Sequence, residues 1–461
     1  MLFRANAGQR SMNEKGLRDR SFFVLLLLML VVRIGLFVAV QPWDPVVQKT
    51  IVLSTEGDAP GYHEYALRII EGRALGDLGV TRTPGYPLII AAVYSVFGVK
   101  PWLVLLLQIA ASAVTFTLLY RLTSSWFNRS AAIAACAMYA LDPHAVLYTN
   151  QFLTDSIFAM VFFMSVMVFL RALDTRNILT FFWAGALVGV ATLIRPLSQF
   201  LPVVYIILSL LFLRKFPSSA LRGTAVLLLA YLIVLAPWLY RNFNEYGSAQ
   251  LTSIGGNMLL DWTVPYVEAA RTGKDISEVR QEFTEIAQRN GLDKTSNPFE
   301  QSRIRTKVAI DYIMQHKMGY MAGSLRGVFY SFINLDTSGY ARLLQLQSKS
   351  SPDVWYGGDS LTSRIHKFIN MKSTGEIVIG TVIVVILTTT YLFCLVGVWC
   401  LLTSRDYWPV IFSGALIGYC LLFIGPIGVA RYKLPFIPLY LSIAGYGFYR
   451  IRNLIISRRT V

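Results

Sequence analysis

The distribution of hydrophobic residues along the chain predicts a helical membrane protein. Long apolar runs recur throughout the sequence, and short segments with polar or charged residues separate them. A helix needs about 20 apolar residues to cross the hydrocarbon core of a bilayer. By this criterion we expect about ten spans, at residues 21–41, 101–121, 130–149, 153–171, 178–194, 198–213, 223–240, 376–402, 408–429 and 434–449. The expected fold class is an all-α polytopic membrane protein.

Basic residues between the runs predict how these spans are oriented. Arginines and lysines are frequent before the first run, in the short loops on that side, and after the last run. Cytoplasmic loops carry such an excess of Lys and Arg. We therefore expect a cytoplasmic basic N-terminus (1–20) and a cytoplasmic basic tail (450–461). The first run is too long for a signal-peptide core, so it is expected to remain as an anchor.

Two long segments then lie on the outer side of the membrane. The expected organisation is a transmembrane catalytic module at 21–240 with an outer loop at 42–100, an outer helical region at 241–375, and C-terminal transmembrane helices at 376–449. In the first loop, Pro87–Gly98 is apolar but too short to span, which predicts an interfacial helix. In the second loop, amphipathic patterns predict helices at about 276–290 and 300–333.

Composition narrows the class further. The 461 residues are 55% hydrophobic and only 15% charged, with a formal charge of +16, and the mean hydropathy is +0.52. A soluble domain carries about 25% charged residues. The positive charge is concentrated in the loops and at the termini, and no nucleic-acid-binding signature is present. We therefore expect no nucleic-acid partner. No phosphate-binding glycine loop, dinucleotide-binding glycine pattern or serine-hydrolase elbow occurs either.

Carboxylates near the expected outer surface are the first candidates for chemistry. Glu56 and Asp58 form a Glu-x-Asp pair beyond the first span, followed by Tyr62 and His63. Asp58 is suited to accept a proton from an acceptor hydroxyl, because partial burial raises the pKa of a carboxyl group. A divalent metal ion held by Glu56 and Asp58 is a second hypothesis. A solvated acidic loop is the plainer interpretation.

Asp155 is a further acid, at the outer start of the fourth span. A carboxylate there complements the positive end of the helix dipole. If Asp155 faces the same cavity as Asp58, the two acids are placed to hold a metal, share a proton or orient an acceptor.

Few basic residues lie at the outer boundary, and these are candidates for binding a phosphate. They are Arg82, Arg195, Arg431 and Lys433, together with Arg241. Guanidinium groups match phosphate oxygens well. Taken singly, each is explained by snorkelling or by a lipid headgroup. Tyr62, Tyr86 and Tyr432 are placed to line a sugar subsite, although interfacial tyrosines are common in any membrane protein.

The order of several short motifs resembles the bacterial branch of glycosyltransferase family 39 and the protein mannosyltransferases, which have the GT-C fold. The motifs are Gly57-Asp-Ala-Pro-Gly-Tyr-His-Glu-Tyr-Ala, Arg82-Thr-Pro-Gly-Tyr-Pro-Leu, Leu153-Thr-Asp-Ser, Arg195-Pro, Pro237-Trp-Leu-Tyr-Arg-Asn, Gly255-Gly-Asn and Arg431-Tyr-Lys-Leu-Pro. The resemblance implies a GT-C-like bundle in a bacterial inner membrane with its active site on the periplasmic side. It also implies transfer of a sugar from a polyprenyl-phosphate donor to a glycan, lipid or protein acceptor, usually with inversion.

The resemblance also implies roles for particular residues. Asp58 takes the place of the catalytic carboxylate in the first loop, and Asp155 matches the second acid of the aminoarabinose-transferring relatives. Arg82 falls near their donor-phosphate residue, but those relatives have Glu-Lys-Pro where this chain has Arg82-Thr83-Pro84. Among the other cations, Arg431 is the next phosphate candidate, followed by Lys433 and Arg195.

Two other functions fit parts of the pattern. A proton-coupled lipid or glycan flippase would use the same acids as proton relays and the cations for an anionic headgroup. Transporters place such groups near the bilayer midplane, whereas here they lie at span ends, with Arg33 inside the first span as the exception. A non-catalytic assembly protein, with the second outer loop as a docking surface, would tolerate loss of Asp58.

Overall fold

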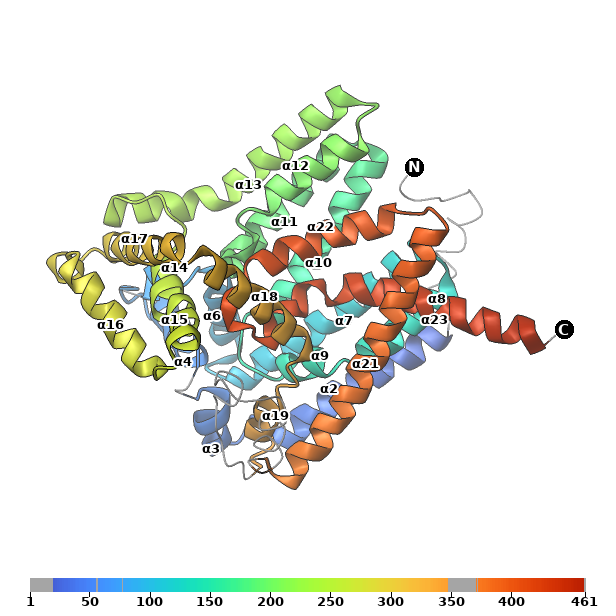
Figure 1. The fold of residues 1–461 in the computed structure, drawn as a ribbon, viewed down its shortest axis with the longest axis horizontal. Helices are drawn as coiled ribbons and strands as arrows, with labels where there is room; N and C mark the ends of the chain where they lie inside the picture. The colour runs from blue at the N-terminus through green and yellow to red at the C-terminus, as the bar shows by residue number, and fades with distance from the viewer. Residues whose placement is uncertain (1–19, 55–56, 77, 347–369, 371, 460–461) are drawn as a thin grey trace.

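The computed structural model describes residues 20–54, 57–76, 78–346, 370 and 372–459. Every regular element in these residues is a helix (Figure 1). Five helices are long and apolar enough to cross a membrane, or six if one bent pair counts as a single span. The five are α2 (Arg20–Val40), α7 (Pro101–Trp126), α10 (Asp155–Thr175), α13 (Pro217–Tyr246) and α21 (Thr374–Thr403). The predicted all-α membrane fold is confirmed.

The other predicted spans do not meet this criterion as single helices. The expected span at 130–149 is two helices, α8 (Arg129–Leu141) and α9 (Pro143–Thr149), which meet at a 53° bend. Pro143 cannot continue the α8 hydrogen-bond ladder, and Asp142 caps α9 by accepting a 2.8 Å hydrogen bond from the backbone N–H of Ala145. The remaining apolar helices in this group are α11 (Ile178–Ile194), α12 (Leu201–Phe212), α22 (Trp408–Leu422) and α23 (Ile437–Arg459).

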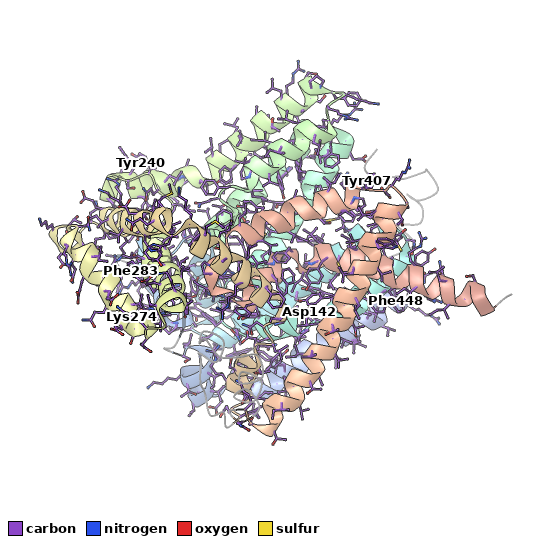
Figure 2. The ribbon with its side chains drawn as sticks, in the orientation of Figure 1. Asp142, Tyr240, Lys274, Phe283, Tyr407 and Phe448 are labelled. Carbon is purple, nitrogen blue, oxygen red and sulfur yellow. The ribbon has the colours of Figure 1, made fainter. Side chains whose placement is uncertain are left out.

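Small residues let these helices approach closely. A Cβ atom added to Gly185 of α11 would lie 2.0 Å from the carbonyl oxygen of Leu227 in α13. Close backbone contact of this kind is typical of membrane helices, which gain little from burying large apolar side chains against each other. Besides the buried core, many large apolar side chains point outward. Figure 2 shows Tyr240, Tyr407 and Phe448 on the outside of the bundle.

The segment at 42–100, predicted as the first outer loop, folds into short helices at one end of the bundle. They are α3 (Pro45–Val47), η1 (Gln48–Val52), α4 (Ala59–Ile70), α5 (Leu78–Thr81) and α6 (Gly85–Phe97). The helix predicted at 87–98 is therefore present as α6. Because α10 begins, and α11 ends, next to this loop, the charged residues at those helix ends lie near it.

The second outer loop is also helical. It comprises α14 (Ile254–Asn257), η3 (Met258–Thr263), α15 (Val264–Thr272), α16 (Ile276–Arg289), η4 (Leu292–Lys294), α17 (Pro298–Gln315), α18 (Lys317–Ile333) and α19 (Thr337–Leu343). The stretch predicted at 300–333 is two helices that are separated at His316. Helices α15 to α17 enclose a small apolar core of their own around Val279 and Phe283.

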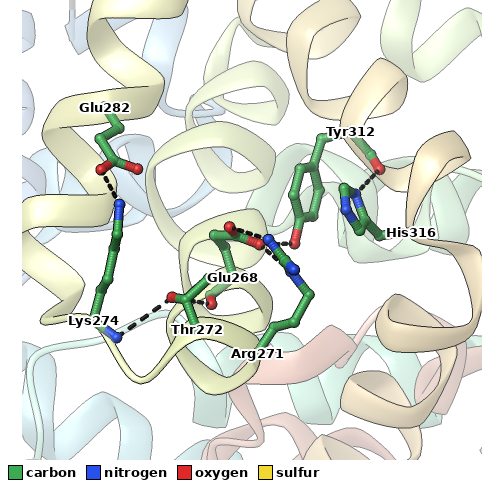
Figure 3. Close-up of polar contacts among 7 residues, drawn as sticks. All are labelled: Glu268, Arg271, Thr272, Lys274, Glu282, Tyr312 and His316. Atoms are coloured by element: carbon green, nitrogen blue, oxygen red, sulfur yellow. Dashed lines mark hydrogen bonds and ion pairs between the residues drawn. The ribbon is translucent and has the colours of Figure 1, made fainter.

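A polar network fastens this small core (Figure 3). Glu268 accepts hydrogen bonds from Arg271 at 2.7 and 2.8 Å and from the Tyr312 hydroxyl at 2.6 Å. Lys274 forms an ion pair with Glu282. These contacts join α15 to α16 and α17. Since each of these groups is engaged within the outer region, the network accounts for the packing of these helices.

Candidate active site

The candidate site is built around Asp58, at the start of α4. Its side chain makes no capping bond to α4 and is directed at two arginines instead. One carboxylate oxygen lies 3.1 Å from Nη1 of Arg82, and the other lies 3.4 Å from Nη1 of Arg431. Asp58 and Arg431 are 373 residues apart in the chain. The contact therefore joins the first outer loop to the turn before the last helix.

Local packing fixes the position of Arg82. The turn that follows it docks on the end of α11, where the Thr83 hydroxyl donates a 3.3 Å hydrogen bond to the carbonyl of Ile194. The Arg82 guanidinium lies 4.5 Å from the ring centre of Tyr62. It also passes close to Gly61, where an added Cβ would come within 2.6 Å of Nε. Gly61 thus leaves the space through which Arg82 reaches Asp58.

Asp155 and Arg195 form a second ion pair beside the first. Asp155 is the first residue of α10 and only 1% exposed, and it accepts a short hydrogen bond from Arg195 at the end of α11. The Arg195 guanidinium lies 5.3 Å from the ring centre of Tyr432, and that of Arg431 lies 5.6 Å from the same ring. Tyr432 therefore links the two ion pairs.

The site carries more positive than negative charge. Three guanidinium groups face two carboxylates, so one positive charge is in excess. Burial alone would raise the pKa of Asp58, but the positive charges of Arg431 and Arg82 outweigh it and lower this pKa. Burial would likewise lower the pKa of Arg431, yet Asp155, Tyr432 and Asp58 raise it. Asp58 and Arg431 are therefore both charged at neutral pH.

One donor of Arg431 is left without a partner. Its Nε is buried and has no hydrogen-bond acceptor in the part of the chain that the structure describes. A buried N–H without an acceptor costs about 1–3 kcal/mol. Together with the excess charge, this donor suits the site to an anion with several oxygens.

The tyrosines and histidine named from the sequence lie at different depths. Tyr62 and Tyr432 are partly exposed beside the arginines. Tyr86 is fully buried behind Tyr62, with ring centres 5.1 Å apart, and its hydroxyl donates to Gln108 at 2.8 Å. His63 makes a 2.8 Å hydrogen bond with the Tyr94 hydroxyl, and burial lowers its pKa. Of this group, Tyr62 and Tyr432 are the two residues beside the charged cluster.

Lys433 differs from the other predicted phosphate ligands. Its side chain is fully buried, and its ammonium donates to the Tyr391 hydroxyl at 3.1 Å and to the carbonyl of Phe332 at 3.5 Å. Burial lowers the pKa of Lys433 to about 8. The structure thus directs Lys433 toward the end of α18 and not toward Asp58.

The described part of the chain does not support the predicted metal site. Glu56 lies outside the described residues, and Asp58 is occupied by two arginines. Within the described ranges, no three His, Cys, Asp or Glu side chains group closely enough to hold a metal ion.

Sequence reasoning missed two residues near this site. The Tyr148 hydroxyl donates a hydrogen bond to Asp336, which lies between α18 and α19. Tyr148 also interacts electrostatically with Arg431 and Asp155. Asp336 has a left-handed backbone, with φ of 50°, a conformation enriched in Asp and Asn. No spacing signal links residues 148 and 336, because only the folded chain brings them together.

Comparisons with known proteins agree with this architecture. The family model described as dolichyl-phosphate-mannose-protein mannosyltransferase matches residues 81–240. A search of curated proteins finds no match. Among solved structures, the chain is similar to the oligosaccharyltransferase AglB from Archaeoglobus fulgidus, in complex with an inhibitory peptide and a dolichol-phosphate. The identity is 12%, the TM-score is 0.51, and the match covers 96% of this chain and 52% of AglB.

A second solved structure in the comparison is ArnT from Cupriavidus metallidurans bound to undecaprenyl phosphate. It shares 15% identity over 93% of this chain and 79% of ArnT, with a TM-score of 0.40. The chain spans about half the length of AglB. The family match and the AglB likeness support the resemblance to GT-C membrane glycosyltransferases, and the expected GT-C-like fold is confirmed.

Proposed function

We propose that this protein transfers a sugar from a polyprenyl-phosphate donor to an acceptor that is a glycan, a lipid or a protein. The main support is that two carboxylates and three guanidinium groups, from five separate parts of the chain, meet at one end of a membrane bundle. The mannosyltransferase match at residues 81–240 includes three of these residues, Arg82, Asp155 and Arg195. Membrane lipids surround the bundle and supply the donor from within the bilayer.

Arg431 and Arg195 are assigned to the donor phosphate. A sugar that leaves a phosphodiester expels a phosphate monoester, whose developing charge needs cationic stabilisation. The two guanidinium groups flank Tyr432, and Arg431 has an unpaired Nε. The polyprenyl chain gains about 0.8 kcal/mol per methylene buried in lipid. The phosphate is therefore held at the bilayer surface, at the depth of span ends such as Arg195.

Asp58 is assigned as the general base. It accepts a proton from the acceptor hydroxyl while that oxygen attacks the sugar from the side opposite the phosphate, which gives inversion. The direct contact between Asp58 and Arg431 leaves no room for a sugar. Donor binding must therefore open this contact, and Arg82 keeps Asp58 in place. When the phosphate takes the charge of Arg431, the pKa of Asp58 rises and the carboxylate becomes a stronger base.

We place the site on the outer face of a bacterial inner membrane with both termini in the cytoplasm. The support is the basic bias of the short loops on the opposite side and the position of the arginines at one end of the bundle. A proton-coupled flippase is the alternative. Arg33, which would favour it, is engaged at the end of α8, where it donates to the carbonyls of Tyr139 at 3.2 Å and Ala140 at 3.1 Å.

A direct assay separates these functions. Purified protein in bilayers is incubated with a panel of polyprenyl-phosphate sugars, and release of the free polyprenyl phosphate is followed. A transferase releases the carrier only when a matching acceptor is present. Movement of the intact donor between leaflets, without carrier release for any sugar, would support the flippase instead.

Replacing Arg431 with alanine is expected to weaken donor binding. Hydrogen bonds to charged groups contribute about 1.5–3 kcal/mol, so the dissociation constant for a polyprenyl-phosphate sugar should rise about 10- to 100-fold. Titration of donor into purified protein measures this. Arg241→Ala is the matched control, because Arg241 pairs with Glu245 and donates to the carbonyl of Gly79, away from Asp58. Equal donor affinity in Arg431→Ala and wild type would remove Arg431 from the phosphate site.

The rate of transfer should change little between about pH 5 and 7, because its base is ionised across this range. Since Arg431 and Arg82 hold the pKa of Asp58 below its ordinary value of about 3.9, the free protein loses this charge only at lower pH. On acidification, kcat should fall at a higher pH than kcat/KM, because bound phosphate withdraws arginine charge from Asp58. Steady-state profiles measure both. A midpoint for kcat/KM near pH 6 would contradict the assignment of Asp58 as the base and would favour His63 instead.

A further inference from the structure

Helix α18 is built with its small residues inside and its large apolar residues outside. Gly323 and Gly327 lie on its inner face, and a Cβ added to Gly327 would lie 2.1 Å from the carbonyl oxygen of Gly425. The other side of α18 carries Met318, Met321, Leu325, Phe329 and Ile333, one at every third or fourth position. In water the large apolar side chains would be the buried ones. The reversed arrangement is typical of a helix surrounded by lipid.

The exposed residues continue onto α17. We call the exposed apolar residues of these two consecutive helices the α17–α18 stripe: Ile310, Met314, Met318, Met321, Leu325, Phe329 and Ile333, each between 39% and 72% exposed. Isolated apolar residues on a surface need no explanation, but exposed apolar residues at every third or fourth position along one helix, as on α18, mark a binding surface. Within the described chain, the outer helix α16 contrasts with it, because most of its outward positions are polar or charged.

The position of α18 and its charged residues indicate what covers the stripe. Helix α18 lies across the turn at Gly425–Ile427 that follows α22, and the end of α22 exposes Leu422 and Phe423. The inner face of α18 thus packs beside the exposed apolar end of α22, one of the shorter apolar helices of the bundle. The charged residues of α18 are Lys317 and Arg326, both basic. Basic residues beside an apolar face favour a membrane with anionic headgroups.

We propose that the α17–α18 stripe inserts into the membrane leaflet on the side of the candidate site, so that the second outer loop is held on the bilayer surface. The end of α18 is joined to the bundle through Phe332, whose carbonyl accepts from Tyr391 at 3.0 Å and from Lys433. Membrane insertion of α18 therefore sets the position of the outer loop relative to the turn that carries Arg431.

Depth-dependent fluorescence quenching tests this proposal without reference to activity. The four native cysteines are replaced by alanine, and single cysteines at Leu325 or Phe329 are labelled with an environment-sensitive dye. The full chain is placed, one copy per disc, in nanodiscs of phosphatidylethanolamine and phosphatidylglycerol. Lipids with a quencher near the headgroup should reduce the emission at least about twofold more than at the control position Ser277 on α16, which is exposed.

The depth of the quencher in the bilayer provides a second test. A quencher near the headgroup should act more strongly than one near the chain end, because an interfacial helix lies only about 5–10 Å deep. Emission from both labelled positions that matches Ser277, with no lipid quenching, would overturn the proposal. If a second copy of the chain covers the stripe, the dye would be shielded from water only in discs that hold two copies. This outcome would also overturn the proposal.

Discussion

Asp58→Asn is expected to abolish sugar transfer while leaving the fold intact. Asparagine has the same shape as aspartate and accepts hydrogen bonds from Arg82, but it cannot take up the acceptor proton. Loss of a general base costs about 10²- to 10⁴-fold in rate. The measurement is carrier release from a polyprenyl-phosphate sugar at saturating donor and acceptor. Asp44→Asn is the matched control, because Asp44 lies in the same loop and accepts hydrogen bonds from Val46 and Val47 at the start of α3.

The same variant separates catalysis from binding. In the proposed mechanism, the donor phosphate competes with Asp58 for Arg431, which pairs with Asp58 in the structure. Removing the charge of Asp58 should therefore leave donor affinity unchanged or tighten it, although turnover is lost. If Asp58→Asn turned over at the wild-type rate, Asp58 would have no part in the chemistry. If it lost donor binding and turnover together, its role would be to hold the two arginines.

Arg195→Met is expected to have the largest effect on stability. Asp155 is 1% exposed and Arg195 is its ion-pair partner, with 15% of its own side chain exposed. Breaking a buried pair by removing one partner costs about 3–5 kcal/mol, because the other charge remains buried without compensation. The purified variant should lose its folded, monodisperse state at a markedly lower temperature than the wild type. Size-exclusion chromatography after stepwise heating measures this loss.

A second substitution tests whether the unpaired charge of Asp155 causes this loss of stability. In Asp155→Asn combined with Arg195→Met, neither charge remains, so most of the stability should return while donor binding stays weak. The pair between Arg241 and Glu245 provides the contrast, because Glu245 is 49% exposed and Glu245→Gln should change stability by only about 0–1 kcal/mol. If the double variant were as unstable as Arg195→Met, loss of packing around Arg195 would explain the defect, not the unpaired charge.

The sequence predicted most of the individual elements because each depends on a local run of residues. The apolar run at 21–41 is α2, and the stretch after Arg82-Thr-Pro is α6. The break within 130–149 was missed, although its signal was present at Asp142-Pro143. A long apolar pattern on both sides concealed this local stop, and hydropathy averaged over a window does not register a single proline.

In the candidate site, too, the sequence predicted the residues but not the contacts that they make. The sequence predicts Asp58 and Arg82 as candidates in the loop at 42–100, and Asp155, Arg195 and Arg431 as candidates near span ends, where an unpaired charge is costly near lipid. Their partners were not predictable. Lys433 has the same kind of sequence position as Arg431, two residues away, yet its ammonium contacts Tyr391 and Phe332. Which way a side chain points from a short helical turn depends on the helices packed around it.

The sequence by itself determined which segments are apolar enough to enter a bilayer and which charged residues lie near their ends, because the free energy of moving a helix into lipid is a sum over its own residues. Only the tertiary structure decided that Asp58 meets Arg431 across 373 residues and that Asp155 pairs with Arg195. It also decided that the large side chains of α18 face outward. Such contacts arise from the packing of distant segments, and no local pattern of polar and apolar residues encodes them.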